Sequence, residues 1–360
     1  LTVYILPFTF AHSRVFNTVG SVNALGLLAA IVLPLFAQIR LAPQRMPKLN
    51  ASYLGLAGGL TVLVILNWWP LWLVACVGML ALIAAQSGYN SSNLGRLDLR
   101  RLILPMLIIV LGVVMTVTNF SVSAVKSQLP LEIVPNYGLS LSIAGKVAGE
   151  RPLVGYGSEQ FSLAFDRYGA SRIADTTLAD ATFFESPAEA ITMFVEGGIV
   201  GLSALLILLA MVGFSVVRLI RMQNTGGANK AVSAAVIAGS IALFFYPFTT
   251  SLLFVLFILL ALAGLEIAGE SVKIISVEEK PALSLVSSLG FVAGLVIAIV
   301  GLYFTGIHYA GEVAYAQGLK SKSPREAVER LTVAINRNSD SDRMYTALSQ
   351  AIMRFISQDL

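Results

Sequence analysis

The chain has 360 residues, of which 56% are hydrophobic and 12% are charged, and its formal net charge is +4. Soluble domains carry about 25% charged residues, so this composition excludes an ordinary soluble enzyme and indicates a membrane protein. The basic residues lie at the ends of apolar runs and do not predict a nucleic-acid partner, and the single Cys76 excludes an internal disulfide.

Apolar runs alternate with polar connections along most of the chain. Runs of about 20 residues match the thickness of a bilayer when they are helical. We therefore predict an all-α fold, a polytopic helical membrane protein with about eight spans. The predicted spans are 19–38, 53–68, 70–85, 102–117, 190–212, 231–246, 251–267 and 285–304.

Two of the connections between these spans are very short. The second and third spans meet at Trp68-Trp69-Pro70, and the sixth and seventh meet at Tyr246-Pro247-Phe248. Trp prefers the water–lipid boundary, and Pro cannot continue a helix. We predict two tight turns on the same side of the membrane.

The distribution of Lys and Arg predicts the orientation. Basic residues concentrate in the connections after the first, third and fifth spans, and such connections are typically cytoplasmic. The two tight turns, a long loop at about 120–190 and the C-terminal tail are then extracytoplasmic. The loop has five basic and eight acidic residues, a net charge of −3. We expect a multi-pass protein of the cytoplasmic membrane.

The long loop contains most residues capable of chemistry. Gly155 and Gly157 permit a tight backbone whose N–H groups could face an anion, with Lys146 and Arg151 as nearby cations; the alternative is an ordinary turn. Glu185 and Glu189 lie one helical turn apart. They are candidate general bases, or they stabilise the start of a helix through its dipole.

Beyond the loop, Glu196 is predicted about one turn inside the fifth span, where an ionisable residue is a functional candidate. The two histidines, His12 and His308, lie far from the loop. The chain shows neither a His–Cys cluster nor a Walker-type nucleotide loop, which argues against a zinc protease and an ATPase. We expect no metal and no cofactor.

The tail differs in composition from the membrane region, so we divide the chain into a membrane domain, 1–304, and a helical segment, 305–360. A helix is predicted to start at Ser323-Pro324 and a break to follow at 336–340. Two apolar stripes are expected, Ala327, Leu331, Ala334 and Ile335, then Tyr345, Leu348, Ile352 and Phe355.

This spacing is typical of a tetratricopeptide repeat, and the alternative is a generic amphipathic helical pair. Since one repeat cannot bury its own apolar face, we expect the tail to continue in a longer protein and to offer a surface to a protein partner. We also expect further spans before residue 1.

Three segments resemble the O-antigen ligase and polymerase superfamily of bacterial envelope membrane proteins. The similar segments are Arg14-x-Phe16-x-x-x-Gly20-x-x-Asn23-Ala24-Leu25-Gly26, Arg151-Pro152-Leu153-Val154-Gly155-Tyr156-Gly157, and 183–201 with its Glu196-Gly197-Gly198-Ile199-Val200-Gly201 end. Their order, the loop size and the topology agree with that family over about 14–270. Asn23 and Glu196 belong to the matching span segments.

The resemblance implies transfer of a glycan from an undecaprenyl-pyrophosphate carrier to an acceptor, on the outer face of the cytoplasmic membrane. It implies that arginines of the outer loops hold the pyrophosphate. Under this hypothesis Arg14, Lys146 and Arg151 would neutralise the pyrophosphate near Gly155 and Gly157, although Lys146 and Arg151 are nearby cations and not equivalents of the family's loop arginine. A base at Glu185 or Glu189 would take the acceptor proton. The expected partners are the lipid-linked glycan and the bilayer.

Two residues of the family pattern lack a match in this chain: the loop arginine ahead of the Pro-Gly-x-Gly element, and a loop histidine. The family places a loop histidine nine residues before the acidic residue that matches Glu196, and this chain has Pro187 there. The alternative hypothesis is therefore a non-catalytic envelope protein that binds glycan or assembles partners. A secondary transporter is a third hypothesis, which the absence of visible inverted repeats disfavours.

Overall fold

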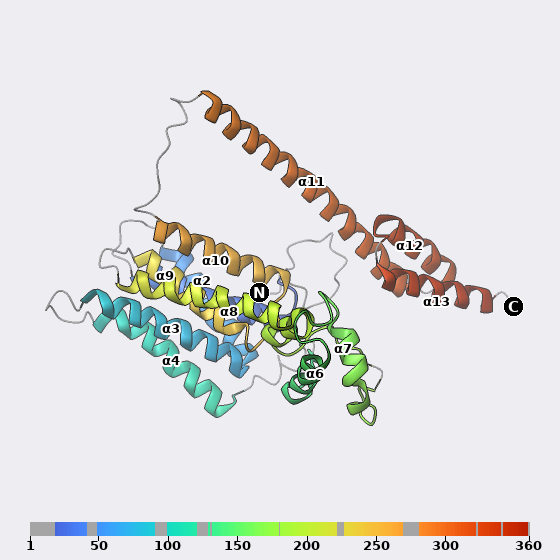
Figure 1. Ribbon diagram of the computed structural model, residues 1–360, viewed down its shortest axis with the longest axis horizontal. Coiled ribbons are helices and arrows are strands. Elements are labelled where there is room, and N and C mark those ends of the chain that lie inside the picture. Colours follow the sequence, from blue (N-terminus) through green and yellow to red (C-terminus); the bar gives the residue numbers. More distant parts are fainter. Residues whose placement is uncertain are drawn as a thin grey trace. The chain divides into compact units, whose positions relative to one another are not determined.

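The computed structural model describes residues 19–41, 49–90, 99–120, 129, 132–179, 181–221, 227–268, 281–321, 323–339 and 341–358. All regular elements within these residues are helices, which confirms the predicted all-α class (Figure 1). The described helices fall into two compact units, one within residues 15–272 and one within 273–360.

The first unit contains most of the helices. It is formed by α1 (Val22–Leu41), α2 (Leu49–Leu66), α3 (Trp69–Asn90), α4 (Leu99–Thr118), α6 (Tyr137–Glu150), α7 (Phe161–Tyr168), the 3-10 helix η1 (Ala170–Arg172), α8 (Glu189–Arg221), α9 (Gly227–Ala242) and α10 (Thr250–Ala268). Figure 1 shows α6 and α7 at the end of the bundle where α8 begins.

The core of this bundle lies between α1, α3 and α9. Leu27, Ile31, Trp72 and Met79 are fully buried there. Small residues let the helices approach closely: a Cβ added at Gly78 would lie 2.9 Å from the Pro34 ring and 3.2 Å from Ala238. Close packing on small residues is the usual way in which helices associate without water.

All eight predicted spans coincide with helices, namely α1, α2, α3, α4, α8, α9, α10 and α11 (Pro281–Lys320). Within the described residues, three stretches are long and apolar enough to cross a membrane, Trp69–Gln86, Glu189–Phe214 and Ser284–Lys320. The other five apolar helices are shorter. The protein therefore has the helices of a membrane protein, and the count of eight spans stays a prediction.

The long loop folds around a second, smaller core. Ile143 and Val147 of α6 pack with Phe161 and Phe165 of α7 and with Val195 of α8, and all five are fully buried. Helix α6 starts at the Asn136 cap, whose side chain accepts the Leu139 N–H at 2.7 Å. This core fixes the loop on the first turns of α8.

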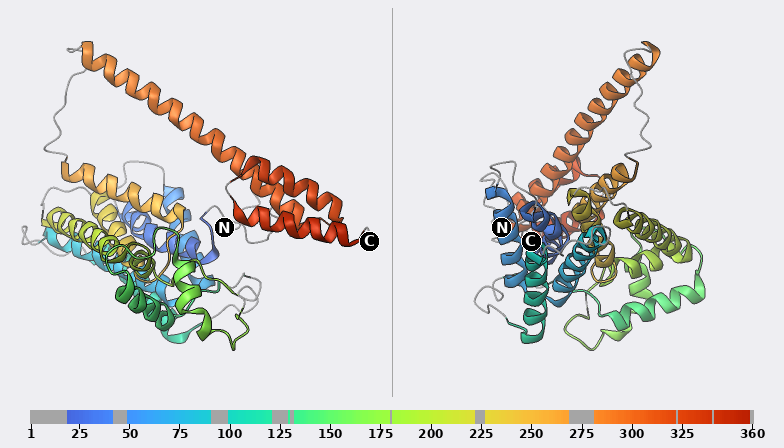
Figure 2. Two further views of the ribbon diagram at one scale, coloured as in Figure 1. Left: turned by 45° about the vertical axis from the view of Figure 1, so that its right-hand side comes forward. Right: turned by 90° about the vertical axis from the view of Figure 1, so that its left-hand side faces the viewer.

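The second unit contains α11, α12 (Pro324–Arg337) and α13 (Asp342–Gln358). Figure 2 shows α12 packed along the last part of α11, and α13 packs on α12. Leu331 of α12 contacts Gly318, where an added Cβ would lie 2.7 Å from the Leu331 side chain. The predicted start at Ser323-Pro324 is confirmed. The predicted domain boundary at 304 falls inside the continuous α11.

One predicted stripe is confirmed and the other is wrong in part. Ala327, Leu331 and Ala334 of α12 are buried as expected. On α13 the buried residues are Met344, Ala347 and Ala351, whereas the expected Tyr345, Ile352 and Phe355 are exposed. The face that packs on α12 is therefore the neighbouring face of α13, and small side chains on it allow the closer approach.

Candidate functional site

A cavity of about 430 Å³ lies at one end of the bundle. It is enclosed by the start of α1, the α2–α3 turn, the segment before α6 and the α9–α10 turn. Its walls are rich in aromatic and proline side chains and contain few polar groups. The lining residues include Asn23, Trp68, Trp69, Pro70, Glu132, Pro135, Tyr137, Pro187, Phe245, Tyr246 and Pro247.

The two tight turns form one wall of this cavity. The Trp68 and Tyr246 rings meet edge to face with centroids 5.6 Å apart, and the Trp69 and Phe245 rings do the same at 5.6 Å. Such edge contacts suit the charge distribution of aromatic rings. The two turns therefore meet at one end of the bundle, and the side of the membrane that they face stays a prediction.

Glu132 is the acidic side chain of the cavity wall. Its Oε1 accepts the backbone N–H of Asn23 at 3.2 Å. Its Oε2 accepts the Asn23 side-chain N–H at 2.9 Å and the Tyr246 hydroxyl at 2.8 Å. The carboxylate is held in one orientation by three donors.

Asn23 was predicted as a site residue, whereas Glu132 and Tyr246 were not. Glu132 lies 109 positions from Asn23 and 114 from Tyr246 in the sequence. Two weak signals were present: Tyr246 belongs to a predicted outer turn, and Asn23 is a polar residue at the start of an apolar run. Nothing local, however, pairs them with a loop glutamate.

Glu185, one of the two predicted bases, lies just ahead of α8 and remains partly exposed to solvent. Burial raises the pKa of its carboxyl group, and the negative charges of Glu132 and Glu196 raise this pKa further. Glu185 itself is not among the residues that line the cavity. A carboxyl group with a raised pKa binds a proton more readily than an ordinary glutamate does.

Glu189, the other predicted base, is the first residue of α8. Its Oε2 accepts the backbone N–H of Phe248 at 2.9 Å, and its own N–H donates to the Tyr246 carbonyl at 3.2 Å. These bonds join the start of α8 to the α9–α10 turn. The observed contact is structural and agrees with the alternative interpretation of a residue that stabilises a helix start.

Helix α8 is broken at Gly198, where φ is 59° and ψ is −153°. The break frees the carbonyls of Val195 and Glu196 and the N–H groups of Ile199 and Val200 from their bonds within the helix. All four groups are satisfied by the loop segment 152–157.

The four bonds form a backbone clasp between the loop and α8. Tyr156 N–H donates to the Val195 carbonyl at 3.0 Å, and Gly157 N–H donates to the Glu196 carbonyl at 2.9 Å. Ile199 N–H donates to the Pro152 carbonyl at 2.8 Å, and Val200 N–H donates to the Leu153 carbonyl at 3.1 Å. The second and third segments of the family resemblance are thus two halves of one contact.

Two glycines make this clasp possible. A Cβ at Gly155 would lie 2.4 Å from the Val195 carbonyl oxygen, and a Cβ at Gly198 would lie 2.5 Å from the Leu153 carbonyl. Both residues also have positive φ, 60° and 59°, a conformation that favours glycine. Side chains at either position would separate the two backbones.

The expectation that the Gly155–Gly157 amides face an anion needs correction. Gly155 N–H donates to the Arg151 carbonyl at 3.0 Å, and the next two amides donate to α8. These three N–H groups point at backbone oxygens because they complete a turn and the clasp. Any role of Gly155 and Gly157 in binding substrate would have to be indirect.

Glu196 lies at the break in α8. Its carboxylate Oε1 accepts the Phe161 N–H at 3.3 Å. Phe161 is the first residue of α7, where a negative charge is favoured by the helix dipole. The Glu196 side chain therefore connects α7 to α8 through a hydrogen bond. Its negative charge is also one of the causes of the raised pKa of Glu185.

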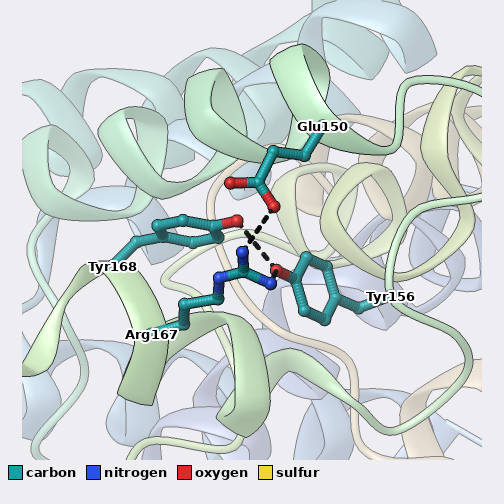
Figure 3. A network of polar contacts seen from close by, with 4 residues as sticks. All are labelled: Glu150, Tyr156, Arg167 and Tyr168. Carbon is teal, nitrogen blue, oxygen red and sulfur yellow. Dashed lines mark hydrogen bonds and ion pairs between the residues drawn. The ribbon is translucent and has the colours of Figure 1, made fainter.

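A polar network joins the loop helices beside the clasp (Figure 3). Arg167 pairs with Glu150 at 3.0 Å and donates to the Tyr156 hydroxyl at 3.2 Å. The Tyr156 and Tyr168 hydroxyls are 2.8 Å apart. The network holds Tyr156 in place, and the Arg151 guanidinium stacks on the same ring at 4.9 Å from its centroid.

Lys146 and Arg151, the cations predicted near the loop glycines, are both exposed. Lys146 lies on α6, and Arg151 ends that helix. Arg14 lies outside the described residues. Among the residues that the structure describes, His, Cys, Asp and Glu do not form a group that could hold a metal ion.

Comparisons of the chain with protein-family models, with curated proteins and with solved structures find no match in any of the three.

Proposed function

We propose that the protein transfers a glycan from an undecaprenyl-pyrophosphate carrier to an acceptor hydroxyl, as its resemblance to the O-antigen ligase and polymerase superfamily implies. The observation that supports this most is the cavity, in which the fixed carboxylate of Glu132 faces aromatic walls. A volume of about 430 Å³ suits a small-molecule site, and such sites combine apolar walls with a few convergent polar groups.

The cavity has the chemistry that a sugar ring requires. The C–H faces of a sugar carry slight positive charge and pack against the negative faces of aromatic rings such as Trp68, Trp69 and Tyr137. A carboxylate has about four lone-pair sites, and the described residues fill three of those on Glu132. The remaining site would accept a hydroxyl proton and orient the sugar.

In the proposed mechanism, an acceptor oxygen attacks the anomeric carbon of the lipid-linked glycan. The bond from this carbon to the pyrophosphate oxygen breaks, and the electron pair leaves with undecaprenyl pyrophosphate. Glu185 accepts the acceptor proton, because its raised pKa makes it a better base near neutral pH. Arg14, Lys146 and Arg151 neutralise the leaving group.

The same proposal includes the membrane arrangement. Eight helices cross the cytoplasmic membrane, and the cavity, the loop and the C-terminal helices face outward. This agrees with the basic residues in alternate connections. The helices α12 and α13 would then recruit a protein partner in the envelope.

One observation favours the alternative, a non-catalytic protein that binds a lipid-linked glycan. Pro187 stands where the resembling family has its histidine, and Pro187 lines the cavity itself. A proline cannot transfer a proton. Under this alternative the cavity retains its aromatic walls and binds sugar without transferring it.

The test uses the full chain in nanodiscs with an undecaprenyl-pyrophosphate-linked oligosaccharide, and it measures release of undecaprenyl pyrophosphate with and without candidate acceptors. Acceptor-dependent release would support transfer. Saturable binding with no release under any acceptor would refute transfer and favour the alternative.

Two matched variants identify the base. Glu185→Gln should lower kcat and leave KM unchanged, because only proton transfer is lost. Glu189→Gln should lower thermal stability more than kcat, because the Glu189 carboxylate accepts the Phe248 N–H. A larger loss of kcat in Glu189→Gln than in Glu185→Gln would instead identify Glu189 as the base and give Glu185 the structural role.

A further inference from the structure

The clasp gathers apolar side chains on one exposed patch. Leu153 is 64% exposed and Val154 is 67% exposed, although both belong to a loop. The clasp places them beside Ile199 and Val200 of α8, which are 51% and 58% exposed. A single exposed apolar residue needs no explanation, but a contiguous group of four indicates a surface that something covers.

The length of the apolar part of α8 locates this patch. Residues 199–217 are 19 consecutive residues without a charge, and Arg218 follows them. At the rise of an α-helix, 19 residues span about 28 Å, close to the hydrocarbon thickness of about 30 Å. We therefore place the span at 199–217, shifted from the predicted 190–212, so that it ends just before Arg218 and begins at the break. The patch then lies at the other edge of the hydrocarbon.

The residues on either side of the turn suit that edge. Arg151 precedes Pro152, and its guanidinium stacks on Tyr156, which follows Gly155, with 4.9 Å to the ring centroid. Arg and Tyr side chains have an apolar body and a polar tip, and both are favoured at the water–lipid boundary. The apolar tip of the turn between them has no charged residue.

We propose that the turn at 152–155 inserts into the outer edge of the bilayer, where Leu153 and Val154 contact lipid acyl chains and Arg151 and Tyr156 lie at headgroup level. The continuity of the patch with the apolar surface of α8 identifies lipid as its occupant. The clasp makes insertion possible, since lipid cannot satisfy backbone polar groups and the loop satisfies those of the broken helix. The inference does not depend on glycan transfer.

The test measures the depth of single labels in the full chain. In a Cys76→Ala background, spin labels are attached to Leu153→Cys and Val154→Cys, with Ser158→Cys as the exposed loop control and Met211→Cys on the exposed face of α8 as the lipid control. The protein is placed in phosphatidylcholine–phosphatidylglycerol nanodiscs. Collisions with oxygen report lipid, and collisions with a water-soluble nickel chelate report water.

Labels at Leu153 and Val154 should lose collisions with nickel and collide with oxygen as the Met211 label does, whereas the Ser158 label should collide with nickel. Nickel access at Leu153 and Val154 equal to that at Ser158 would overturn the proposal. Protection from both reagents would show that protein covers the patch and would overturn it as well. A Met211 label in water would refute the span on which the argument rests.

Discussion

Gly198→Ala is the sharpest perturbation of the clasp between the loop and α8. If the clasp persisted, the new Cβ would lie 2.5 Å from the Leu153 carbonyl, and the residue would keep a backbone conformation that costs about 1–3 kcal/mol. If the clasp opened, four backbone hydrogen bonds would be lost and α8 could re-form two of its own. At about 1 kcal/mol per bond, the net loss would be about 2 kcal/mol.

Opening is therefore the favoured response, and it has a distinct signature in hydrogen exchange. The amides of Tyr156 and Gly157 should lose protection, because their acceptors return to the helix. The amides of Ile199 and Val200 should stay protected, because they bond to Val195 and Glu196 as in an ordinary helix. Exchange measured by mass spectrometry in nanodiscs, on peptides covering the loop and α8, would separate the two pairs.

The neighbouring residue supplies the control. A Cβ at Gly197 would meet nothing within 4 Å, so Gly197→Ala should leave the exchange pattern unchanged and stabilise α8 by up to about 1 kcal/mol. Equal exchange at Tyr156 and Gly157 in the two variants would refute the clasp as a determinant of loop position.

Three further predictions concern other parts of the protein. Tyr246→Phe removes the hydroxyl that donates to Glu132 and should lower stability by about 1–3 kcal/mol, seen as a lower midpoint in thermal unfolding; an unchanged midpoint would contradict the observed bond. Leu331→Ala leaves a cavity in the core of the C-terminal unit, where Leu331 is 1% exposed, and should lower the free energy of unfolding of that unit by about 2–5 kcal/mol. The control Val333→Ala, at an exposed position, should lower it by less than about 1 kcal/mol. Equal losses of stability in the two variants would place Leu331 outside the core. The raised pKa of Glu185 in the folded state stabilises the fold at low pH. This contribution is complete below the ordinary glutamate pKa of 4.5 and is lost as the pH rises through the folded-state pKa. Wild type should therefore gain thermal stability relative to Glu185→Gln as the pH falls from neutral, and a stability difference that does not change with pH would exclude a raised pKa at Glu185.

The helices could be predicted because each depends on a local pattern. A membrane span requires a long apolar run. Such runs coincide with α3, α8 and α11, which contain the stretches long enough to cross a membrane, and also with shorter apolar helices such as α1 and α10. The start of α12 was also predictable from a local signal, because proline is favoured in the first turn of a helix. The predicted stripe on α13 was wrong in part, because periodicity shows that a helix has an apolar face but not which neighbour that face meets.

The site was less accessible to sequence analysis because its contacts are remote in the chain. Glu132 meets Asn23 across 109 positions, and a glutamate in a polar loop has no local feature that marks it. Gly155 and Gly157 carried a correct signal, an unusual backbone, but the local interpretation as an anion site was replaced by a contact with α8. That contact depends on the break at Gly198, which lies inside a continuous apolar run.

Release of undecaprenyl pyrophosphate by the full chain in nanodiscs, compared for wild type, Glu132→Gln and Glu159→Gln, tests the central claim most directly. Glu159 is exposed and lies outside the cavity lining, so Glu159→Gln should retain acceptor-dependent release. Glu132→Gln should weaken binding of the lipid-linked glycan and reduce release by roughly 10-fold to 100-fold, the effect of a lost hydrogen bond to a charged group. Equal release by all three proteins would contradict the assignment of the cavity as the site of glycan transfer.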